Sequence, residues 1–398
     1  MSNTDLGAKI CMFFMNYALL NQPVYQAFRS KVRAFVDTHI VPEALDWENS
    51  QTFPHYLLAE FAAAGLIGLS LPLDIGGQGK DLWHEVILAE ELGRAKTFGY
   101  PASVLVHTNM VLPLLASLAV GQQKEQFLTP AVRGEHYLAL AITEPHSGSD
   151  VAAIQTQAVS NGFSYRVSGE KKYISNGSVA NTIVTLVRSD STTERDTSMA
   201  FDLLLMPAKL KGLTKVRLST NGLNTGDMGH IIFDQCDVPQ ENLLGKTGFG
   251  FYYITKFVQR ERLIGSAYGV ALGQFVLTET IEFLKNRERF GSPLSRKQAI
   301  RHKVAGLHAK LFAAQQATYA VTDSYSRGDN VEADIMALKL FVGETVQEVL
   351  RECVQLHGAE GFVRSHWLSH VYRDSQTFSI LGGTSEIMRD ILAGMIKM

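Results

Sequence analysis

The chain has 398 residues, of which 46% are hydrophobic and 19% charged, and this length predicts a globular protein of about two to three domains. With 37 Lys and Arg residues against 39 Asp and Glu residues, the formal net charge is -2. Such a charge offers no field that gathers nucleic acid or an anionic membrane, so we expect no nucleic-acid binding. We also expect no membrane span.

The apolar stretch at residues 10–20 is too short to span a bilayer and has no obvious cleavage site, which favours a docked arm over a signal. No Arg-rich transit peptide is visible, and we expect a cytoplasmic protein. The cysteines are an odd number at no metal-like spacing, which favours free thiols in a reducing compartment. None is interpreted as catalytic: Cys11, Cys236 and Cys353.

Helical spacing of apolar residues begins at Pro23 and continues to about residue 138, with helices expected over 57–64 and 82–92. The helix expected directly after Pro23 carries its apolar residues on one face: Val24, Phe28, Val32 and Phe35. Short β-rich runs, including 201–206, follow and are separated by clusters of Asn, Gly, Ser and Asp.

Beyond residue 246 the chain returns to long helical stretches with almost no proline, expected near 250–289 and 331–356. Helices of this length usually pack as a bundle. We therefore predict a multi-domain α+β protein with three parts: an N-terminal all-α domain (1–138), a middle β-sheet domain (139–246) and a C-terminal four-helix bundle (247–398).

Two segments of the middle part could bind a polar heterocycle. In LAITEPHSGSD (140–150) the small residues let backbone N–H groups approach an anion, and the Thr143 hydroxyl can hydrogen-bond a ring. In GEKKYISNG (169–177) Tyr173 and Ser175 lie two residues apart and so face the same side of a strand. Taken singly, the first is equally an ordinary turn and the second an ordinary strand that ends in an Asn-Gly turn.

Two segments of the C-terminal part could bind a phosphate-bearing ligand. At RERFG (287–291) a long helix is expected to end in a glycine, where Arg287 can pair with a diphosphate and Phe290 can cover an aromatic ring. In QLHGAEGF (355–362) the glycines allow the backbone to approach a ligand closely. An arginine at a helix end is usually just solvated, so neither segment is specific alone.

Five segments in this order resemble the signatures of the acyl-CoA dehydrogenase family of flavoproteins over nearly the whole chain. They are AITEPHSGSD (141–150), KKYISNG (171–177), RERFG (287–291) with Gln298, QLHGAEGF (355–362) and YRDSQTFSILGGTSEIMR (372–389). The three-part organisation resembles that family too. The resemblance implies FAD as the cofactor and an acyl thioester as the substrate.

The resemblance also implies where FAD binds. Its isoalloxazine is expected near Leu140, Ile142, Thr143, Tyr173 and Ser175, and its phosphates near Gly148 and Ser149. Its adenosine diphosphate part is expected near Arg287, Phe290, Gln298, Gln355, Gly358, Ala359, Thr384 and Glu386. Several of these residues are expected to reach a neighbouring subunit, which implies a homo-oligomer, either a tetramer or a dimer. Tyr173 stands where many relatives have Trp.

In the implied reaction a carboxylate removes the α-proton, flavin N5 accepts the β-hydride, and a backbone N–H stabilises the thioester oxygen. The family's commonest base aligns with Gly382, which cannot abstract a proton but keeps its N–H. Glu261 stands at the base position of the long-chain and isovaleryl types, 287 - 261 = 26 residues before Arg287, or about seven helical turns. The resemblance thus implies Glu261 as the base, with Arg262 and Ser149 near the substrate.

Three functions remain open. An acyl-CoA dehydrogenase that passes electrons to an electron-transfer flavoprotein is favoured. Asn224 stands where many relatives have Arg, and His146 and His230 favour the alternative of a dehydrogenase for acyl groups on a carrier protein in biosynthesis. A non-catalytic flavin-fold partner protein is the third. As lone histidines, His146 and His230 are more often surface or hydrogen-bonding residues than catalysts.

Overall fold

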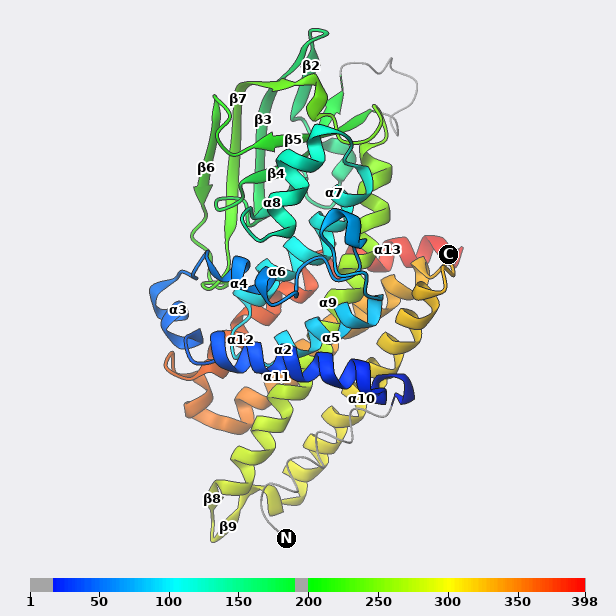
Figure 1. The fold of residues 1–398 in the computed structure, drawn as a ribbon. Helices are drawn as coiled ribbons and strands as arrows, with labels where there is room; N and C mark the ends of the chain where they lie inside the picture. Colours follow the sequence, from blue (N-terminus) through cyan, green and yellow to red (C-terminus); the bar gives the residue numbers. More distant parts are fainter. Residues whose placement is uncertain (1–16, 190–199, 398) are drawn as a thin grey trace. The chain divides into compact units, whose positions relative to one another are not determined.

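The computed structural model describes residues 17–189 and 200–397, which fall into two compact units. The first contains the described residues up to Ser50, Asp81–Pro101 and the residues from Arg262 onward. The second contains Gln51–Lys80 and Ala102–Glu261. The long helix α9 (Gly250–Asn286) continues through the boundary, which separates Glu261 from Arg262 (Figure 1).

The first unit is helical. Its helices, besides the later part of α9, are α2 (Pro23–His39), α3 (Ala44–Ser50), α5 (Leu82–Leu92), α10 (Gln298–Ser326), α11 (Glu332–His357), α12 (Trp367–Ser375) and α13 (Ser385–Met395). Pro23 opens α2, and Asp81 caps α5 by accepting a hydrogen bond from the His84 N–H at 3.3 Å. The helix ends therefore lie where the residue types require.

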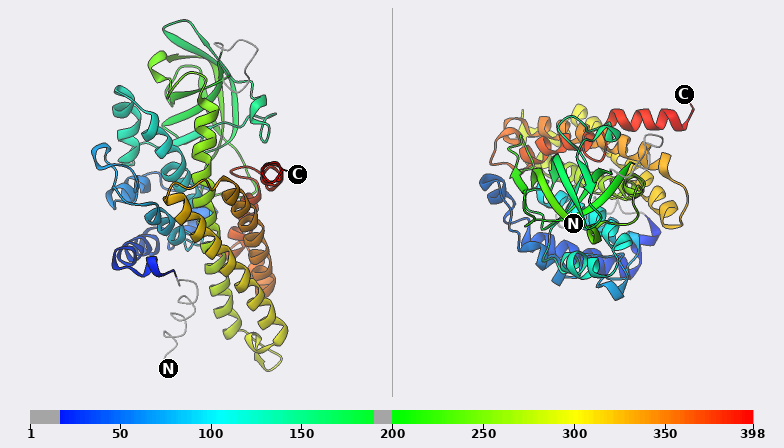
Figure 2. Two further views of the ribbon diagram at one scale, coloured as in Figure 1. Left: turned by 90° about the vertical axis from the view of Figure 1, so that its right-hand side faces the viewer. Right: turned by 90° about the horizontal axis from the view of Figure 1, so that it is seen from above.

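Small residues let the helices of this bundle approach closely, and Figure 2 shows α9, α10 and α11 running alongside one another. A Cβ added at Gly273 of α9 would lie 2.8 Å from a methyl of Leu311 in α10. A Cβ at Gly269 would lie 3.2 Å from a methyl of Val342 in α11. A larger residue at either position would require neighbouring side chains to shift.

The second unit is built on a mixed seven-stranded sheet with the strand order β1-β4-β2-β3-β7-β6. The seventh strand, β5, lies off this path and also pairs with β4. The strands are β1 (Leu138–Ala141), β2 (Gln157–Ser160), β3 (Ser164–Ser175), β4 (Thr182–Ser189), β5 (Phe201–Pro207), β6 (Leu213–Arg217) and β7 (Met228–Pro239). Pairing is parallel between β1 and β4 and between β2 and β4, and antiparallel elsewhere. The helices of this unit are α4 (Leu57–Ala63), α7 (Leu112–Leu118), α8 (Thr129–Val132) and the end of α6 (Gly99–Leu105).

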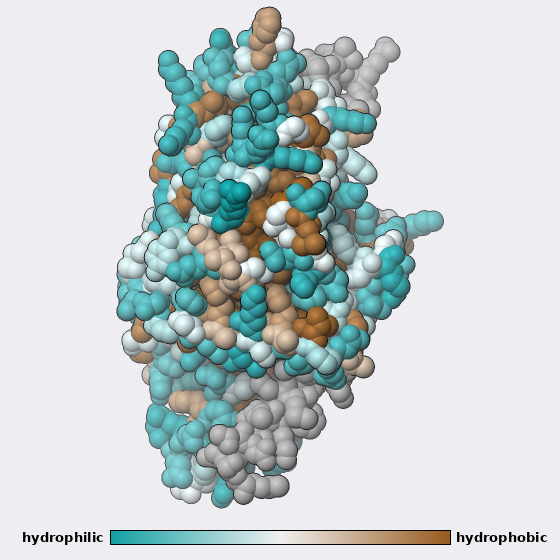
Figure 3. Space-filling model, in the orientation of Figure 1, coloured by the Kyte–Doolittle hydropathy of each residue, from teal (hydrophilic) through white to brown (hydrophobic). Residues whose placement is uncertain are grey.

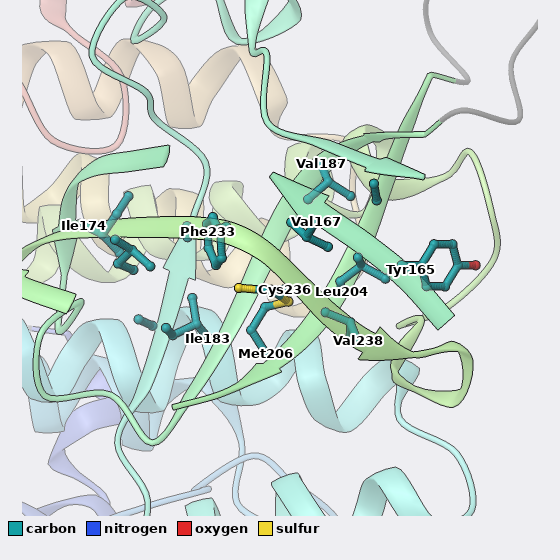
Figure 4. Close-up of a cluster of buried hydrophobic side chains, with 14 of the residues drawn as sticks. Tyr165, Val167, Ile174, Ile183, Val187, Leu204, Met206, Phe233, Cys236 and Val238 are labelled. Atoms are coloured by element: carbon teal, nitrogen blue, oxygen red, sulfur yellow. The ribbon is translucent and has the colours of Figure 1, made fainter. Parts of the chain in front are cut away.

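One face of the sheet carries a buried hydrophobic cluster (Figure 4). Val167 of β3, Ile183 of β4 and Leu204 of β5 contribute fully buried side chains, and Phe233 and Val238 of β7 complete it. Burying each such side chain stabilises the fold by roughly 1.5–3 kcal/mol, which explains why this sheet keeps one register. The alternating burial along β7 follows from this single apolar face.

The fold class is confirmed: an N-terminal helical part, a middle sheet and C-terminal helices. One described stretch, Gly99–Leu118, is apolar and long enough to cross a membrane, but 72% of its window is buried, as in a core helix. Hydrophilic residues cover much of the face shown in Figure 3. Cys236 and Cys353 are buried free thiols, whereas Cys11 and residues 10–16 lie outside the described residues.

Two details of the sequence prediction are wrong. The helix expected to reach residue 289 ends at Asn286, and a hairpin of β8 (Glu288–Arg289) and β9 (Ser292–Pro293) follows. Its turn residues Phe290 and Gly291 have φ of 52° and 74°, the left-handed conformation that a tight two-residue hairpin turn requires. In α2, Val24 is 51% exposed, and the buried face includes Arg29 instead.

Candidate active site

The structure brings together the two segments of the second unit that are expected to bind the flavin, residues 141–150 and 171–177, called the flavin segments below. The main-chain N–H of Lys172 donates to the carbonyl of Thr143 at 2.9 Å. The Nζ of Lys171 donates to the carbonyl of Ile142 and to Oε1 of Glu144, both at 2.8 Å. The loop that follows β1 is therefore bound to β3 through three consecutive residues.

Glu144 is the buried centre of this arrangement. Its carboxylate also accepts from the main-chain N–H groups of Gln155 at 2.6 Å and Thr156 at 2.9 Å. Burial alone raises the pKa of Glu144, but the hydrogen bonds from Lys171 and Thr156 hold that pKa below its usual range. Burial lowers the pKa of Lys171 to about 8, against the opposing effect of Glu144. His146 lies 3.4 Å from the same carboxylate.

The ring of Tyr173 is 53% exposed and stands on a bulge of β3, where its φ is 63°. Ile142, Thr143 and Ser175 are half-buried, whereas Leu140 is buried within β1. Gly148 and Ser149 are exposed, in a turn whose Glu144 and Ser147 exchange main-chain hydrogen bonds. An exposed aromatic ring beside hydroxyls and a glycine turn fits a flat, polar, phosphate-bearing cofactor.

In the helical unit, two of the predicted phosphate segments also meet. Arg287, the first residue after α9, lies 3.8 Å from the carboxylate of Glu360, which follows Gly358 and Ala359. Phe290 at the hairpin tip is 95% exposed. The other predicted residues of this set that are exposed are Gln298, Gln355, Gly358, Ala359 and Glu386. A cation, an exposed aromatic ring and exposed amides are side chains that suit the adenosine diphosphate part of FAD.

The loop before α13 is held by two cations. Arg262 donates from Nε to the carbonyl of Gly382 at 2.8 Å, and Lys339 donates from Nζ to the carbonyl of Gly383. Lys339 is 8% exposed, and its contact with Gly383 is partly buried. Thr384 then caps α13 by accepting from the Ile387 N–H at 3.2 Å.

Both glycines of this loop are conformationally required. Their φ values are 68° for Gly382 and 99° for Gly383, a region that other L-residues adopt only with strain. A Cβ at Gly383 would lie 2.8 Å from the Met388 methyl and 3.2 Å from the Arg262 guanidinium. The loop therefore presents main chain and no side chain at these two positions.

Glu261 is half-buried in α9, immediately before Arg262. It belongs to the second unit, in which the adjacent Arg260 donates to the Ser70 hydroxyl at 2.5 Å. Sequence reasoning singled out Glu261 and Arg262 but missed Glu144, Lys171 and Lys339. Only the position of Glu144 and Lys171 inside the two flavin segments could have drawn attention to them.

Three family models match the chain: the acyl-CoA dehydrogenase N-terminal domain at residues 22–135, its middle domain at 139–236 and its C-terminal domain at 248–396. The chain belongs to the acyl-CoA dehydrogenase family. It is therefore an FAD-dependent oxidoreductase that acts on CH–CH bonds.

Characterised relatives of this dehydrogenase match along almost the whole chain. The mitochondrial long-chain specific acyl-CoA dehydrogenase of Sus scrofa is 28% identical over 370 residues, which are 93% of this chain and 85% of that protein. The caffeyl-CoA reductase–Etf complex subunit CarC of Acetobacterium woodii is 30% identical, covering 92% of this chain and 97% of that one. The crystal structure of an acyl-CoA dehydrogenase from Geobacillus kaustophilus has a TM-score of 0.91 at 28% identity, covering 95% of this chain and 99% of that chain.

Proposed function

We propose that this enzyme dehydrogenates an acyl-CoA thioester between its α and β carbons, with Glu261 as the base that removes the α-proton. The observation that carries the proposal is the loop at Gly382, where the family's commonest base is replaced by a glycine with φ of 68°. Glycine offers no carboxylate, so proton abstraction needs another residue. Glu261 is the carboxylate that the family resemblance assigns to this task.

The Gly382 loop supports the second half of the reaction, the stabilisation of the developing enolate. With its carbonyl held by Arg262 and the next carbonyl held by Lys339, the main chain at Gly382 keeps one orientation. A fixed backbone N–H aimed at the thioester oxygen stabilises negative charge without reorganisation. We therefore assign Gly382 as the main-chain donor and Arg262 as the residue that positions it.

The substrate class rests on the relatives. Proteins named for long-chain acyl-CoA and caffeyl-CoA match over more than nine-tenths of this chain, which supports a CoA thioester. FAD, when bound, supplies the acceptor for the two electrons that leave the substrate. We assign its flavin part to Thr143, Tyr173 and Ser175 and its diphosphate part to Arg287.

Two partners are part of the proposal. The family resemblance expects FAD-binding residues of this region to reach a neighbouring subunit, and Phe290 at the hairpin tip is 95% exposed and so accessible to one, which supports a homo-oligomer. An electron-transfer flavoprotein is the proposed electron acceptor, in keeping with the name of the Acetobacterium woodii relative, a subunit of a complex with Etf.

Anaerobic absorbance titration of the purified holoenzyme tests this function. Acyl-CoA esters of graded chain length should bleach the flavin absorbance, with one length bleaching it at the lowest concentration. Bleaching only by acyl groups on phosphopantetheinylated carrier protein would move the substrate to carrier-protein thioesters. Intact absorbance with every thioester would contradict the proposed dehydrogenation.

A further inference from the structure

Two opposite charges are completely buried at the proposed flavin site. The side chains of Lys171 and Glu144 are 0% and 1% exposed, and their charged atoms lie 2.8 Å apart. Placing one such charge alone in a protein interior costs several kcal/mol, so each is tolerated because the other is present. Nothing in proton abstraction or substrate binding requires this pair, which leaves its function to be explained.

The pair also fixes the main chain that is proposed to face the flavin. Lys171 binds the carbonyl of Ile142, Glu144 binds the N–H groups of Gln155 and Thr156, and Thr143 lies between the two. Thr143 is itself held through its carbonyl by the Lys172 N–H. The segment 142–144 is therefore fixed by contacts on both sides of Thr143.

We propose that Lys171 and Glu144 are positioning residues for the flavin, and that their two charges balance so that neither one dominates its reduction potential. The inference rests on the proposed flavin site. Two-electron reduction with uptake of one proton gives an anionic reduced flavin, which a nearby cation stabilises and a nearby anion destabilises. A pair of opposite charges can hold the segment 142–144 in place and still produce little net electric field at the flavin.

Removing one charge at a time tests this balance. In Glu144→Gln the pKa of Lys171 falls, because Glu144 no longer raises it. The midpoint potential of the bound flavin is therefore measured from pH 5 to pH 9, and it should lie above that of the wild type at the acidic end, where Lys171 is charged. Lys171→Met leaves the Glu144 carboxylate and should lower the midpoint potential. We expect each shift to change the ratio of reduced to oxidised flavin by about tenfold at fixed potential, which is about 30 mV for a two-electron couple.

The double variant Lys171→Met/Glu144→Gln and a neighbouring control complete the design. The double variant should return the potential close to that of the wild type, while FAD affinity falls about tenfold because Ile142 has lost its donor. Glu170→Gln is the control, because Glu170 adjoins Lys171 but its side chain is 44% exposed and pairs with His230 at 2.6 Å. It should leave the potential unchanged.

A merely structural pair would give a different pattern. Single variants that lower stability but leave the potential unchanged, or shift it in the same direction, would overturn the inference. Where a single variant yields no folded holoenzyme, the double variant decides, and an unchanged FAD affinity would overturn the positioning role. Thr143→Val tests the proposed flavin site separately from the charge pair. If this variant binds FAD as tightly as the wild type does, the proposed flavin site is wrong. If it binds FAD more weakly while the charge variants show no opposite shifts in potential, the flavin site stands and only the inference about the pair fails.

Discussion

Arg262 donates a hydrogen bond from its guanidinium Nε to the carbonyl oxygen of Gly382 at 2.8 Å. The same guanidinium places Nη1 at 3.2 Å from the sulfur of Met336 in α11, so its orientation is fixed by packing as well. Arg262 is the neighbour of Glu261 in α9. One helix thus carries both the proposed base and the residue that orients the proposed oxyanion donor.

Replacing Arg262 by Lys keeps the positive charge but removes the planar fork that holds Gly382. We expect kcat/KM for the acyl-CoA substrate to fall about 10–100-fold with FAD content unchanged, because a displaced loop misaligns the substrate carbonyl. Steady-state kinetics against Arg301→Lys, the same change at an exposed position of α10, is the comparison. Equal kcat/KM values for the two variants would show that Arg262 does not position the Gly382 loop for catalysis.

A side chain at Gly383 should destabilise the protein. Gly383→Ala combines a positive φ of 99° with a Cβ 2.8 Å from the Met388 methyl, which must shift. Because this methyl ends a flexible side chain, we expect the variant to lower the free energy of unfolding by only about 1 kcal/mol more than Gly328→Ala does. Gly328 also has a positive φ, 82°, but no described atom lies within 4 Å of its added Cβ. Urea unfolding of both variants measures the difference, and equal losses would show that the contact has no effect.

Arg287 should hold the diphosphate of FAD. Arg287→Ala removes a charged, partly exposed partner and should weaken FAD binding about tenfold or more, as the loss of a charge-assisted contact does. Arg289→Ala on the adjoining strand of the hairpin is the matched control and should retain FAD. Dialysis followed by the flavin-to-protein absorbance ratio measures retention, and full retention by Arg287→Ala argues against this site.

The buried His107 should make the free energy of unfolding depend on pH. Its ring is fully buried, accepts from the Leu138 N–H at 3.2 Å and lies 3.2 Å from the Ala131 carbonyl, and burial lowers its pKa from 6.5 to about 4. The unfolded chain therefore binds a proton that the folded chain excludes between these pH values. The free energy of unfolding should fall by roughly 3 kcal/mol as the pH drops from 6.5 to about 4.

His107→Gln should remove most of this pH dependence, whereas the exposed His302→Gln should keep it. Urea unfolding at a series of pH values measures the slope for each protein. The same slope in His107→Gln as in the wild type would show that other groups cause the acid sensitivity.

Elements that are buried along nearly their whole length were predictable from the sequence. The helix expected over 82–92 is α5, and the run expected over 201–206 is most of β5; both are rich in apolar residues and lie in the core. β6 carries a much weaker signal, because Leu213 and Val216 are its only apolar residues and the strand is largely exposed. The hairpin after α9 was missed because its turn places a phenylalanine at positive φ, which residue preferences argue against.

Buried charged residues were the main feature that the sequence prediction missed. Arg29 lies in the buried face of α2, and its partners Glu90 and Glu91 are more than 60 residues away in the chain. Lys171 is likewise paired with a carboxylate 27 residues earlier. Neither partner can be read from local spacing, since a charged residue in a strand or helix normally faces solvent. Only the three-dimensional fold pairs them.

The proposed base is tested most directly by anaerobic stopped-flow measurement of flavin reduction in Glu261→Gln. Gln keeps the shape of Glu but cannot accept the α-proton, so FAD content and fold should be retained while the reduction rate falls by about three or more orders of magnitude. Glu282→Gln is the control, because this Glu lies on the same helix and its half-exposed side chain pairs with Lys285 at 2.6 Å. Its rate should equal that of the wild type, and near-normal reduction by Glu261→Gln would contradict the assignment of the base.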